Sequence, residues 1–458
     1  MLVPYKARDL EGHALVGYFL ERQYGHEVIY SNGYGIERKL LEFEPDALIL
    51  DHLSWDFKVR QAELAKKLGM KVIILPTEGL FQNKEGAIRR SGKLHHATRL
   101  IDNYLTWGTY PRDAILEEGL IAPDKIHVVG CPRFDFYRSP YLSLMRSKED
   151  LARHFGIGNL NAPMILWATN TPYASRDKRT ALFLQTKRAK KPQEEVVKHI
   201  EDHITQYHSH SSVITSLAKR HPEWNFIIKV HPAEWINPYV KLIKGLPNIF
   251  LAYNMPIREI LYYADILIQR NCTTATEAWM LDKPVINLEI GEYRRPVREE
   301  YKRGNFLAYS LNEAESIMQN VLRGMSISEE QQKIRRLFIK DFYYKIDGGS
   351  SERAAALIHK SISSPEYTEE DLMAKREKVR LAYREWKSRE DKRLVNRIKD
   401  FLCIPRSTAL RFFEKIFFWK AKHNLGYFEA EVEIAPTSVS RLYRQYGDLL
   451  NGMENIRS

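Results

Sequence analysis

The segment FIIKVHPAEW, residues 226–235, carries an apolar run straight into a rigid polar turn. Phe226 to Val230 have the length and composition typical of a buried strand in a parallel sheet. His231-Pro232 follows at once, so the proline stiffens the turn while the imidazole can donate to a phosphate oxygen. Open parallel sheets bind ligands beyond the carboxyl ends of their strands. The segment therefore predicts an α/β fold with a phosphate-binding turn after this strand.

The dipeptide alone leaves an alternative open, because isolated short motifs often match by chance. On that alternative, a turn proline simply stands beside an ordinary surface histidine. A second copy, His221-Pro222, lies between a helical segment and the next strand. This position is at the wrong end of the predicted sheet, so we interpret the second copy as a connector.

Short apolar runs alternate with helical segments along most of the chain. In the first half, ALVGYFLERQYGHEVIYSN indicates a helix, a glycine stop and a strand, and PDALILDHL, KVIILPTEG and KIHVVGCPRFD indicate further strands. The second half restarts at PMILWATNTPY and continues through NFIIKV, IFLAY, DILIQR and PVINLE. We therefore predict two Rossmann-like, doubly wound α/β domains, residues 1–150 and 151–363, that face each other across a cleft. A basic C-terminal helical tail covers residues 364–458.

A pair of hydroxyls follows the strand DILIQR, in the stretch QRNCTTATEAWMLD. Thr273 and Thr274 precede a helix, so hydroxyls and unpaired backbone N–H groups are expected to converge on one point, as at an anion site. Simple N-capping by either threonine is the alternative. Glu277, in the first helical turn, fits ligand contact or complementarity to the helix dipole.

A third polar junction follows the first strand of the second half, in WATNTPYASRD. Thr169, Asn170 and Thr171 offer donors suited to a phosphate or a sugar. An ordinary polar turn is the alternative, and the residues alone favour it slightly.

Two acids are candidates for catalysis in the first half. Glu78 follows a strand in ILPTEG and is expected to face the cleft, where a carboxylate can act as base or nucleophile on a sugar. A solvated loop glutamate is the alternative. Asp135 in GCPRFDFYR is the rival acid, although its nearness to Arg133 favours a structural ion pair.

Composition argues against disulfide-rich, metal-binding, membrane-spanning and secreted proteins. The sequence has 458 residues, 44% hydrophobic and 28% charged, with a formal net charge of +12 and three cysteines. The cysteines are widely spaced, which argues against a disulfide framework or a zinc site, and no Asp-x-Asp metal pair is present. No apolar run reaches the roughly 20 residues of a membrane span, and the N-terminus does not resemble a secretory signal. We expect a cytoplasmic protein that needs neither metal nor cofactor.

Taken in order, the motifs PTEG, WG, VVGCPRFD, TNT, KVHP and RNCTTATEAWMLDKPV resemble the bacterial surface carbohydrate biosynthesis proteins. These are GT-B-fold glycosyltransferases similar to capsule and lipopolysaccharide Kdo transferases and, more distantly, to bacterial sialyltransferases. The resemblance spans about residues 5–362. YYKIDGGSSERAAALI looks like the family's final segment, which folds back across the domains.

The resemblance implies a GT-B-like fold and a CMP-sugar donor, such as CMP-Kdo or another CMP-ulosonic acid. His231, Thr273 and Thr274 would bind the donor phosphate, while Pro232 and Glu277 would belong to the nucleotide and sugar site. Arg270, beside the hydroxyl loop, would pair with the donor carboxylate. The threonines stand where serine is common in the family, so the hydroxyl that contacts the phosphate stays open. Whether the reaction inverts or retains the anomeric configuration also stays open.

The stretch from Lys375 to Lys422 carries about ten surplus positive charges, so it accounts for most of the net charge of +12. Residues 409–423, ALRFFEKIFFWKAKH, mix aromatic and basic side chains as a helix in a membrane interface does. We expect contact with the inner face of the cytoplasmic membrane, with packing on the body or on a second subunit as the alternative. No nucleic-acid-binding motif is present, and the oligomeric state stays open.

Three functions are therefore compared. The leading one is a metal-independent glycosyltransferase that moves a CMP-linked sugar onto a bacterial surface glycan or a lipid-linked glycan acceptor. The second is a teichoic-acid-type phosphotransferase that uses a CDP-polyol, which requires additional phosphate-binding groups. The third is a basic assembly protein without enzymatic activity that recruits partners or membrane through its tail.

Overall fold

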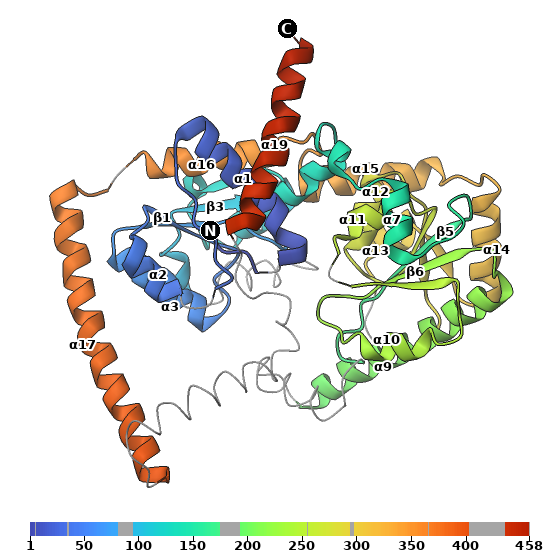
Figure 1. The fold of residues 1–458 in the computed structure, drawn as a ribbon, viewed down its shortest axis with the longest axis horizontal. Helices are drawn as coiled ribbons and strands as arrows, with labels where there is room; N and C mark the ends of the chain where they lie inside the picture. Colours follow the sequence, from blue (N-terminus) through green and yellow to red (C-terminus); the bar gives the residue numbers. More distant parts are fainter. Residues whose placement is uncertain are drawn as a thin grey trace. The chain divides into compact units, whose positions relative to one another are not determined.

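The computed structural model describes residues 1–402 and 436–457, apart from positions 5, 34–35, 81–94, 175–192, 254, 294–296 and 365. The chain divides into two compact units (Figure 1). Unit 1 comprises Met1–Arg133 and Gly349–Ser458, and unit 2 comprises Phe134–Gly348. Each is an α/β unit built on one parallel sheet, so the predicted pair of Rossmann-like domains is confirmed.

Unit 1 contains a parallel sheet of four strands in the order β1-β2-β3-β4. The strands are β1 (Ala47–Leu50), β2 (Lys71–Ile74), β3 (Asn103–Thr106) and β4 (Ile126–Val128). The first part of the chain supplies the helices α1 (Lys6–Tyr24), α2 (Ile36–Phe43), α3 (Asp56–Lys67), α5 (His95–Thr98) and α6 (Thr109–Glu117) and the 3₁₀ turn η1 (Pro123–Lys125). The C-terminal part adds α16 (Ser350–Ile362), α17 (Glu369–Leu402) and α19 (Pro436–Arg457).

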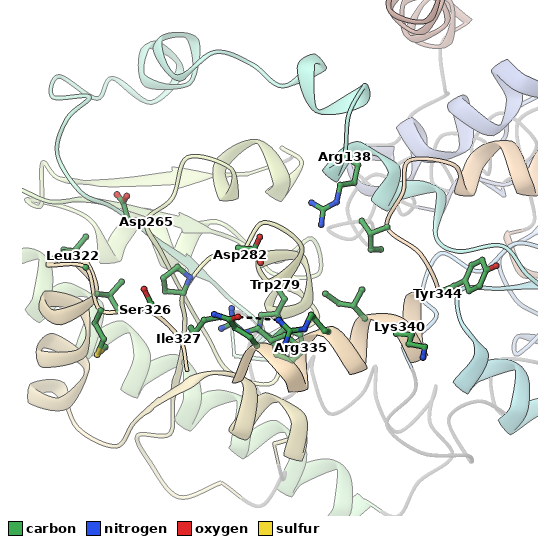
Figure 2. Close-up of a pocket in the computed structure, with 18 residues that line it drawn as sticks. Arg138, Asp265, Trp279, Asp282, Leu322, Ser326, Ile327, Arg335, Lys340 and Tyr344 are labelled. Carbon is green, nitrogen blue, oxygen red and sulfur yellow. Dashed lines mark hydrogen bonds between the residues drawn. The ribbon is translucent and has the colours of Figure 1, made fainter. Parts of the chain in front are cut away.

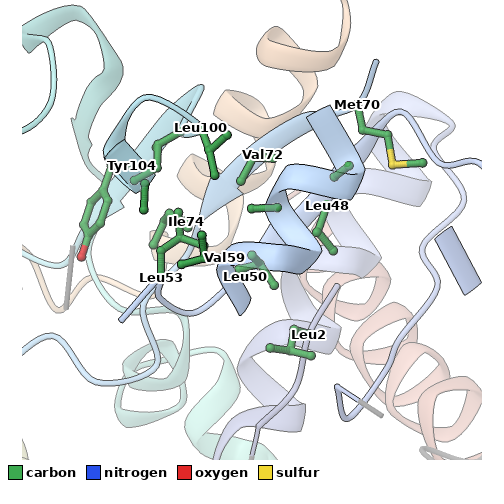
Figure 3. Close-up of a cluster of buried hydrophobic side chains, with 14 of the residues drawn as sticks. Leu2, Leu48, Leu50, Leu53, Val59, Met70, Val72, Ile74, Leu100 and Tyr104 are labelled. Atoms are coloured by element: carbon green, nitrogen blue, oxygen red, sulfur yellow. The ribbon is translucent and has the colours of Figure 1, made fainter. Parts of the chain in front are cut away.

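The core of unit 1 forms because alternate residues of the strands point to the same face of the sheet. Leu48 and Leu50 of β1 and Val72 and Ile74 of β2 pack against α3, as Figure 3 shows. The predicted strand after Gly25 forms only one bridge, between Ser31 and Leu2. There the chain pairs with the N-terminal residues, whose hydrogen bonds to Ile29 and Ser31 replace a full ladder.

The C-terminal helices are grouped with unit 1. Helix α16 packs along α1, and α19 also contacts α1. Tyr446 of α19 is fully buried, and its hydroxyl donates to the Glu11 carbonyl at 3.1 Å. A Cβ atom at Gly17 would lie 2.6 Å from the Tyr443 hydroxyl, so this glycine permits the close approach of α19. These contacts explain why the compact units differ from the expected ranges 1–150, 151–363 and 364–458.

Unit 2 contains a parallel sheet of six strands in the order β10-β9-β8-β5-β6-β7. The strands are β5 (Met164–Ala168), β6 (Asn225–Lys229), β7 (Ile249–Ala252), β8 (Ile266–Gln269), β9 (Val285–Leu288) and β10 (Phe306–Ala308). The α-helices are α7 (Lys148–Phe155), α9 (Gln193–Arg220), α10 (Asn237–Leu242), α11 (Ile257–Leu261), α12 (Thr274–Met280), α13 (Glu299–Gly304), α14 (Leu311–Leu322) and α15 (Glu329–Tyr343). Two 3₁₀ segments, η2 (Pro132–Tyr137) and η3 (Tyr141–Leu144), stand near the beginning of the unit.

The strand order of unit 2 reverses direction between β5 and β8. From β5 the chain proceeds outward through β6 and β7, then returns to add β8, β9 and β10 on the other side. This is the doubly wound Rossmann order, and the point of reversal is where such sheets bind ligands. The buried apolar faces of these strands form one core with α9, α10 and α14.

None of the helices that the structure describes is long and apolar enough to cross a membrane. Residues 409–423, for which we predicted membrane contact, lie outside the described residues.

Candidate functional site

Three loops meet at the reversal point of the unit 2 sheet. They follow the carboxyl ends of β5, β6 and β8, which are neighbours in the sheet. Thr169 after β5 accepts a hydrogen bond from the His231 N–H after β6, at 2.8 Å. Asn170 Nδ2 donates to the Asn271 carbonyl after β8, at 3.4 Å. The structure thus brings together the three groups of unit 2 residues that we predicted separately.

The His231-Pro232 turn holds its imidazole in a defined tautomer. The Ala233 N–H donates to His231 Nδ1 at 3.1 Å. A neutral imidazole has one N–H, so the proton of His231 must then lie on Nε2. The Glu234 N–H closes the turn on the His231 carbonyl at 2.9 Å. His231 is therefore preset to donate through Nε2.

Glu234 is a buried acid beneath this turn that sequence reasoning did not single out. Its carboxylate accepts from the Thr171 N–H and the Tyr239 hydroxyl and is completely buried. Burial raises its pKa to about 7, although these hydrogen bonds oppose the shift. The signal was available in the quoted HPAEW, where an acid follows the His-Pro pair by two residues. Perturbed acids of this kind gather at functional sites.

Lys229, the last residue of β6, is a second buried ionisable group at this edge. Its Nζ donates to the Val230 carbonyl at 3.1 Å. Burial lowers its pKa to about 8, while the nearby carboxylates of Glu234 and Glu277 act in the opposite direction. The edge therefore contains an acid and a base whose pKa values both lie near neutrality.

The hydroxyl loop after β8 does not serve as a helix cap. Asn271 adopts a left-handed φ of 50°, which turns the chain sharply into α12. Thr273 is exposed and makes no side-chain capping bond, so the simple N-capping alternative does not apply to it. The buried Thr274 hydroxyl lies beside the Cys272 thiol and has no other hydrogen-bond partner among the described residues. Both hydroxyls thus remain uncommitted to the helix start.

Arg270 and Glu277 are bound to protein groups. Arg270 Nε lies 3.1 Å from Glu289 Oε2, and its guanidinium lies 3.8 Å from the centroid of the Tyr293 ring. Glu277 is buried and accepts a hydrogen bond from the Tyr137 hydroxyl. Their present partners give both residues a structural role at this edge.

The predicted acid of unit 1, Glu78, is part of a charged network at the carboxyl edge of that sheet. Arg8 Nη1 donates to Glu78 Oε1 at 2.9 Å. The same guanidinium holds Asp9 through two bonds of 2.7 and 3.0 Å. Arg133 Nη1 lies 3.6 Å from Asp9 Oδ1. Arg8 therefore links Glu78 to the buried carboxylate of Asp9.

The loop that carries Glu78 is fixed by close packing. Trp107 Nε1 donates to the Pro76 carbonyl at 2.8 Å. A Cβ atom at Gly79 would lie 2.3 Å from the Trp107 ring, so no larger residue fits there without displacing the indole. The glycine after Glu78 thus has a packing role that fixes the position of the acid.

Asp135, the rival acid, lies in the 3₁₀ segment η2 of unit 2 and is 1% exposed. The predicted ion pair of Asp135 with Arg133 stays a prediction. Glu78 is much more accessible, with a side chain 46% exposed. Accessibility favours Glu78 over Asp135 as the acid that reaches a substrate.

A separate cavity lies elsewhere in unit 2. It measures about 980 Å³ and is bordered by α15 and by Asp265 and Pro284, which immediately precede β8 and β9 (Figure 2). It therefore opens at the amino edge of the sheet, opposite the loops that carry His231 and Thr273. Arg335, which lines it, braces the fold through the Gly304 and Lys283 carbonyls at 2.8 and 3.0 Å. We place the candidate site at the carboxyl edge because the donor groups converge there.

Among the residues that the structure describes, no group of three or more His, Cys, Asp or Glu side chains has the arrangement of a metal site. Cys131 and Cys272 are both buried. The third cysteine, Cys403, lies outside the described residues.

The sequence matches no protein-family model and no curated protein. Solved structures do resemble it. A wall teichoic acid polymerase TagF variant soaked with CDPG aligns with 79% of this chain and 87% of its own, at a TM-score of 0.50 and 13% identity. The Methanocaldococcus jannaschii UDP-GlcNAc 2-epimerase in complex with UDP-GlcNAc and UDP aligns with 77% of this chain and 96% of its own. Its TM-score is 0.49 and its sequence identity is 14%.

A further structure, the UDP-GlcNAc 2-epimerase from Neisseria meningitidis bound to UDP-GlcNAc, covers 72% of this chain and 80% of its own. Its TM-score is 0.47 and its identity is 18%. Among these three structures, the TagF variant alone reaches a TM-score of 0.50, and at 13% identity its likeness concerns the fold alone.

Proposed function

We propose that this protein is a glycosyltransferase that transfers a sugar from a CMP-linked donor, with the donor phosphate bound in unit 2. One observation carries the proposal: the loops after β5, β6 and β8 converge at the reversal point of a doubly wound sheet. This is the position at which such sheets bind nucleotides. The resemblance of the motifs to surface carbohydrate biosynthesis proteins supplies the CMP-ulosonic acid class.

His231 is the proposed phosphate clamp. Its Nε2–H is fixed as a donor by the Ala233 bond to Nδ1. The hydroxyls of Thr273 and Thr274 supply further donors from the loop after β8. When the bond to the sugar breaks, negative charge grows on the phosphate, and donors already in place stabilise it without reorganisation.

Glu78 is the proposed catalytic carboxylate of unit 1, acting as a base or a nucleophile. In an inverting reaction its carboxylate takes the proton of the acceptor hydroxyl. The acceptor oxygen forms a bond to the anomeric carbon, and CMP departs with the electron pair of the broken C–O bond. In double displacement, a carboxylate attacks the anomeric carbon instead and the acceptor then displaces it. Arg8 favours the ionised carboxylate that both routes require.

Arg270 is the proposed partner of the donor carboxylate, and that role has a structural requirement. Its Nε already lies 3.1 Å from Glu289, whose pKa is raised by burial. A donor carboxylate would have to share the guanidinium with Glu289 or replace it. The ulosonic acid class is therefore supported mainly by the sequence resemblance, and nucleotide binding is the first property to test.

A CDP-polyol phosphotransferase is the second candidate, because the chain shares its fold with a teichoic acid polymerase that was soaked with CDPG. In that reaction the acceptor attacks the β-phosphate, so a second set of phosphate donors is needed. The third candidate, an assembly protein that recruits partners or membrane through its basic tail, predicts that no nucleotide binds.

Calorimetric titration of the full chain with CMP, CDP and UDP tests the proposal. We expect CMP to bind best, and incubation with CMP-Kdo and glycan acceptors to release CMP. Glu78→Gln should abolish transfer while leaving CMP affinity unchanged, because the two residue sets lie in different units. Preference for CDP would favour the phosphotransferase. If none of the three nucleotides binds, the transferase is rejected.

A further inference from the structure

Two aromatic side chains stand exposed at the carboxyl edge of the unit 1 sheet. Strand β1 ends at Leu50, and Trp55 and Phe57 follow at the start of α3. Trp55 is 53% exposed and Phe57 is 38% exposed. Their ring centroids lie 5.4 Å apart, with an angle of 40° between the ring planes. We refer to Trp55 and Phe57 as the aromatic platform.

A buried cation, Lys58, lies against both rings of the aromatic platform. Lys58 is 3% exposed, and its Nζ lies 5.0 Å from the Trp55 ring centroid and 6.0 Å from that of Phe57. The Trp55 carbonyl accepts bonds from the N–H groups of Lys58 and Val59, at 2.9 and 3.1 Å. These contacts fix the indole while leaving half of its surface open. Preorganised aromatic anchors of this kind bind at low entropic cost.

Polar groups border the same rings. The His52 ring meets Trp55 edge to face at 4.9 Å. Its Nδ1 lies 2.9 Å from the Ser54 hydroxyl, and its Nε2 lies 3.1 Å from Lys58 Nζ and 3.5 Å from Asp51 Oδ2. Asp51 also pairs with Lys58. An apolar surface rimmed by such groups is the composition of a site for a ligand that is itself half apolar and half polar.

A pyranose ring has that composition. One of its faces presents C–H groups, and its edge presents hydroxyls that need hydrogen-bond partners. The charges near the platform are paired with one another, as Asp51 with Lys58, which suits a neutral polyol better than a highly charged ligand. The platform also lies near the proposed catalytic acid, because the charge of Glu78 acts on Lys58.

We propose that Trp55 and Phe57 bind a pyranose ring of the acceptor glycan by stacking, with His52 at the polar rim contacting its hydroxyls. This inference rests on the proposed function and names the acceptor class for the same reaction. It also explains why a tryptophan is exposed beside a charged, well-ordered edge. The platform would place an acceptor hydroxyl on the side of unit 1 that carries Glu78.

Saturation-transfer NMR of the full chain with the methyl glycosides of glucose, galactose and N-acetylglucosamine tests the platform. We expect at least one glycoside to show transfer that is concentrated on the C–H protons of one ring face. Trp55→Ala should weaken its binding about tenfold, and Phe57→Ala should weaken it less, because the indole has the larger stacking surface. Circular dichroism checks that both variants fold.

Phe43→Ala is the matched control. Phe43 is 52% exposed, nearly as much as Trp55, but it ends α2 and so lies toward the amino end of β1. Its replacement should leave glycoside binding unchanged. The platform is refuted if none of the glycosides binds, or if binding survives in the Trp55→Ala variant. It is also refuted if Trp55→Ala changes the sedimentation coefficient by dissociating an oligomer, since the rings would then be a protein interface.

A CMP titration of the same variants separates this inference from the proposed function. If CMP binds to the Trp55→Ala variant as to the wild type while glycosides do not, both proposals stand. If glycosides bind but CMP does not bind to the wild type, the platform stands and the CMP-dependent transferase fails. If CMP binds and the glycosides do not, the donor proposal stands and the platform is rejected.

Discussion

The carboxyl edges of the two sheets both contain buried acidic side chains, but the groups that bind these acids differ between the two units. In unit 1, buried acids are paired with cations, as Asp51 is with Lys58 and Asp9 is with Arg8. In unit 2, the buried acid Glu234 is held by a hydroxyl and a backbone N–H. Ion pairing therefore favours the charged form of Asp51 in unit 1, whereas burial favours the neutral form of Glu234 in unit 2.

The pKa values express this difference. Burial opposes the ionisation of Asp51, but His52 and Lys58 together outweigh it, so its pKa is lowered. Burial dominates for Glu234 and raises its pKa to about 7. Both carboxyls are buried, and only the neighbours differ. A cation in direct contact with the carboxylate thus decides the direction of the shift, as expected where Coulomb attraction competes with desolvation.

The largest predicted effect tests the paired edge. Asp51→Asn would leave Lys58 buried without its counter-charge, which should lower the free energy of unfolding by about 3–5 kcal/mol. Urea denaturation measures this change. Asp150→Asn is the control, because its 2.9 Å pair with Arg153 is exposed and is expected to contribute less than about 1 kcal/mol. Equal losses in the two variants would contradict the account.

The second prediction concerns the pH dependence of stability that Glu234 causes at the carboxyl edge of unit 2. The folded pKa of Glu234, about 7, lies above its ordinary value of 4.5, so the folded chain retains a proton that the unfolded chain loses. The stabilisation is fully present below pH 4.5 and is lost as pH rises to 7, by on the order of 2–3 kcal/mol.

Glu234→Gln should remove this pH dependence. Unfolding free energies of the variant and the wild type, measured between pH 4.5 and 8, should therefore diverge as pH rises, with the variant gaining relative stability. If the difference between the two proteins stays constant over this range, Glu234 does not titrate as described.

The smallest effect tests the contact that joins two loops of the site. Thr169→Val removes the hydroxyl that accepts the His231 N–H, which should cost about 1–2 kcal/mol and weaken CMP binding by misplacing the imidazole. Thr169→Ser keeps the hydroxyl and should restore both properties. Thermal unfolding and calorimetry provide the two measurements. Loss in Thr169→Ser as well would show that the hydroxyl alone does not account for the effect.

Much of the fold could be predicted because its strands are short apolar runs with clear boundaries. NFIIKV, DILIQR and PVINLE all form parallel strands where expected. The strands β3 and β10 were missed, because NYLT and FLA are too short and too mixed in character to stand out from their flanks. The grouping of the C-terminal helices with unit 1 was not evident from the sequence, because the packing of α19 on α1 joins residues that are far apart in the chain.

The meeting of three loops in unit 2 was predictable, because it follows from their positions after neighbouring strands. His231, Thr169 and Asn271 come together because β5, β6 and β8 are neighbours, which the alternating pattern implies. Glu234 was overlooked because nothing in the local pattern shows that it turns inward to Thr171 and Tyr239. The pairing of Arg270 with Glu289 also required the structure, because it joins the ends of two strands.

The two His-Pro pairs offer the most direct test of the central claim, that the carboxyl edge of unit 2 binds the donor phosphate. His221 precedes β6, stacks on Trp224 at 3.8 Å and pairs with Glu315 at 2.7 Å, whereas His231 follows the same strand. CMP affinity should therefore be measured by calorimetry for His231→Ala and His221→Ala. We predict a loss of about tenfold or more for His231→Ala and no change for His221→Ala. If both variants bind CMP as the wild type does, or lose it equally, His231 is not the phosphate clamp.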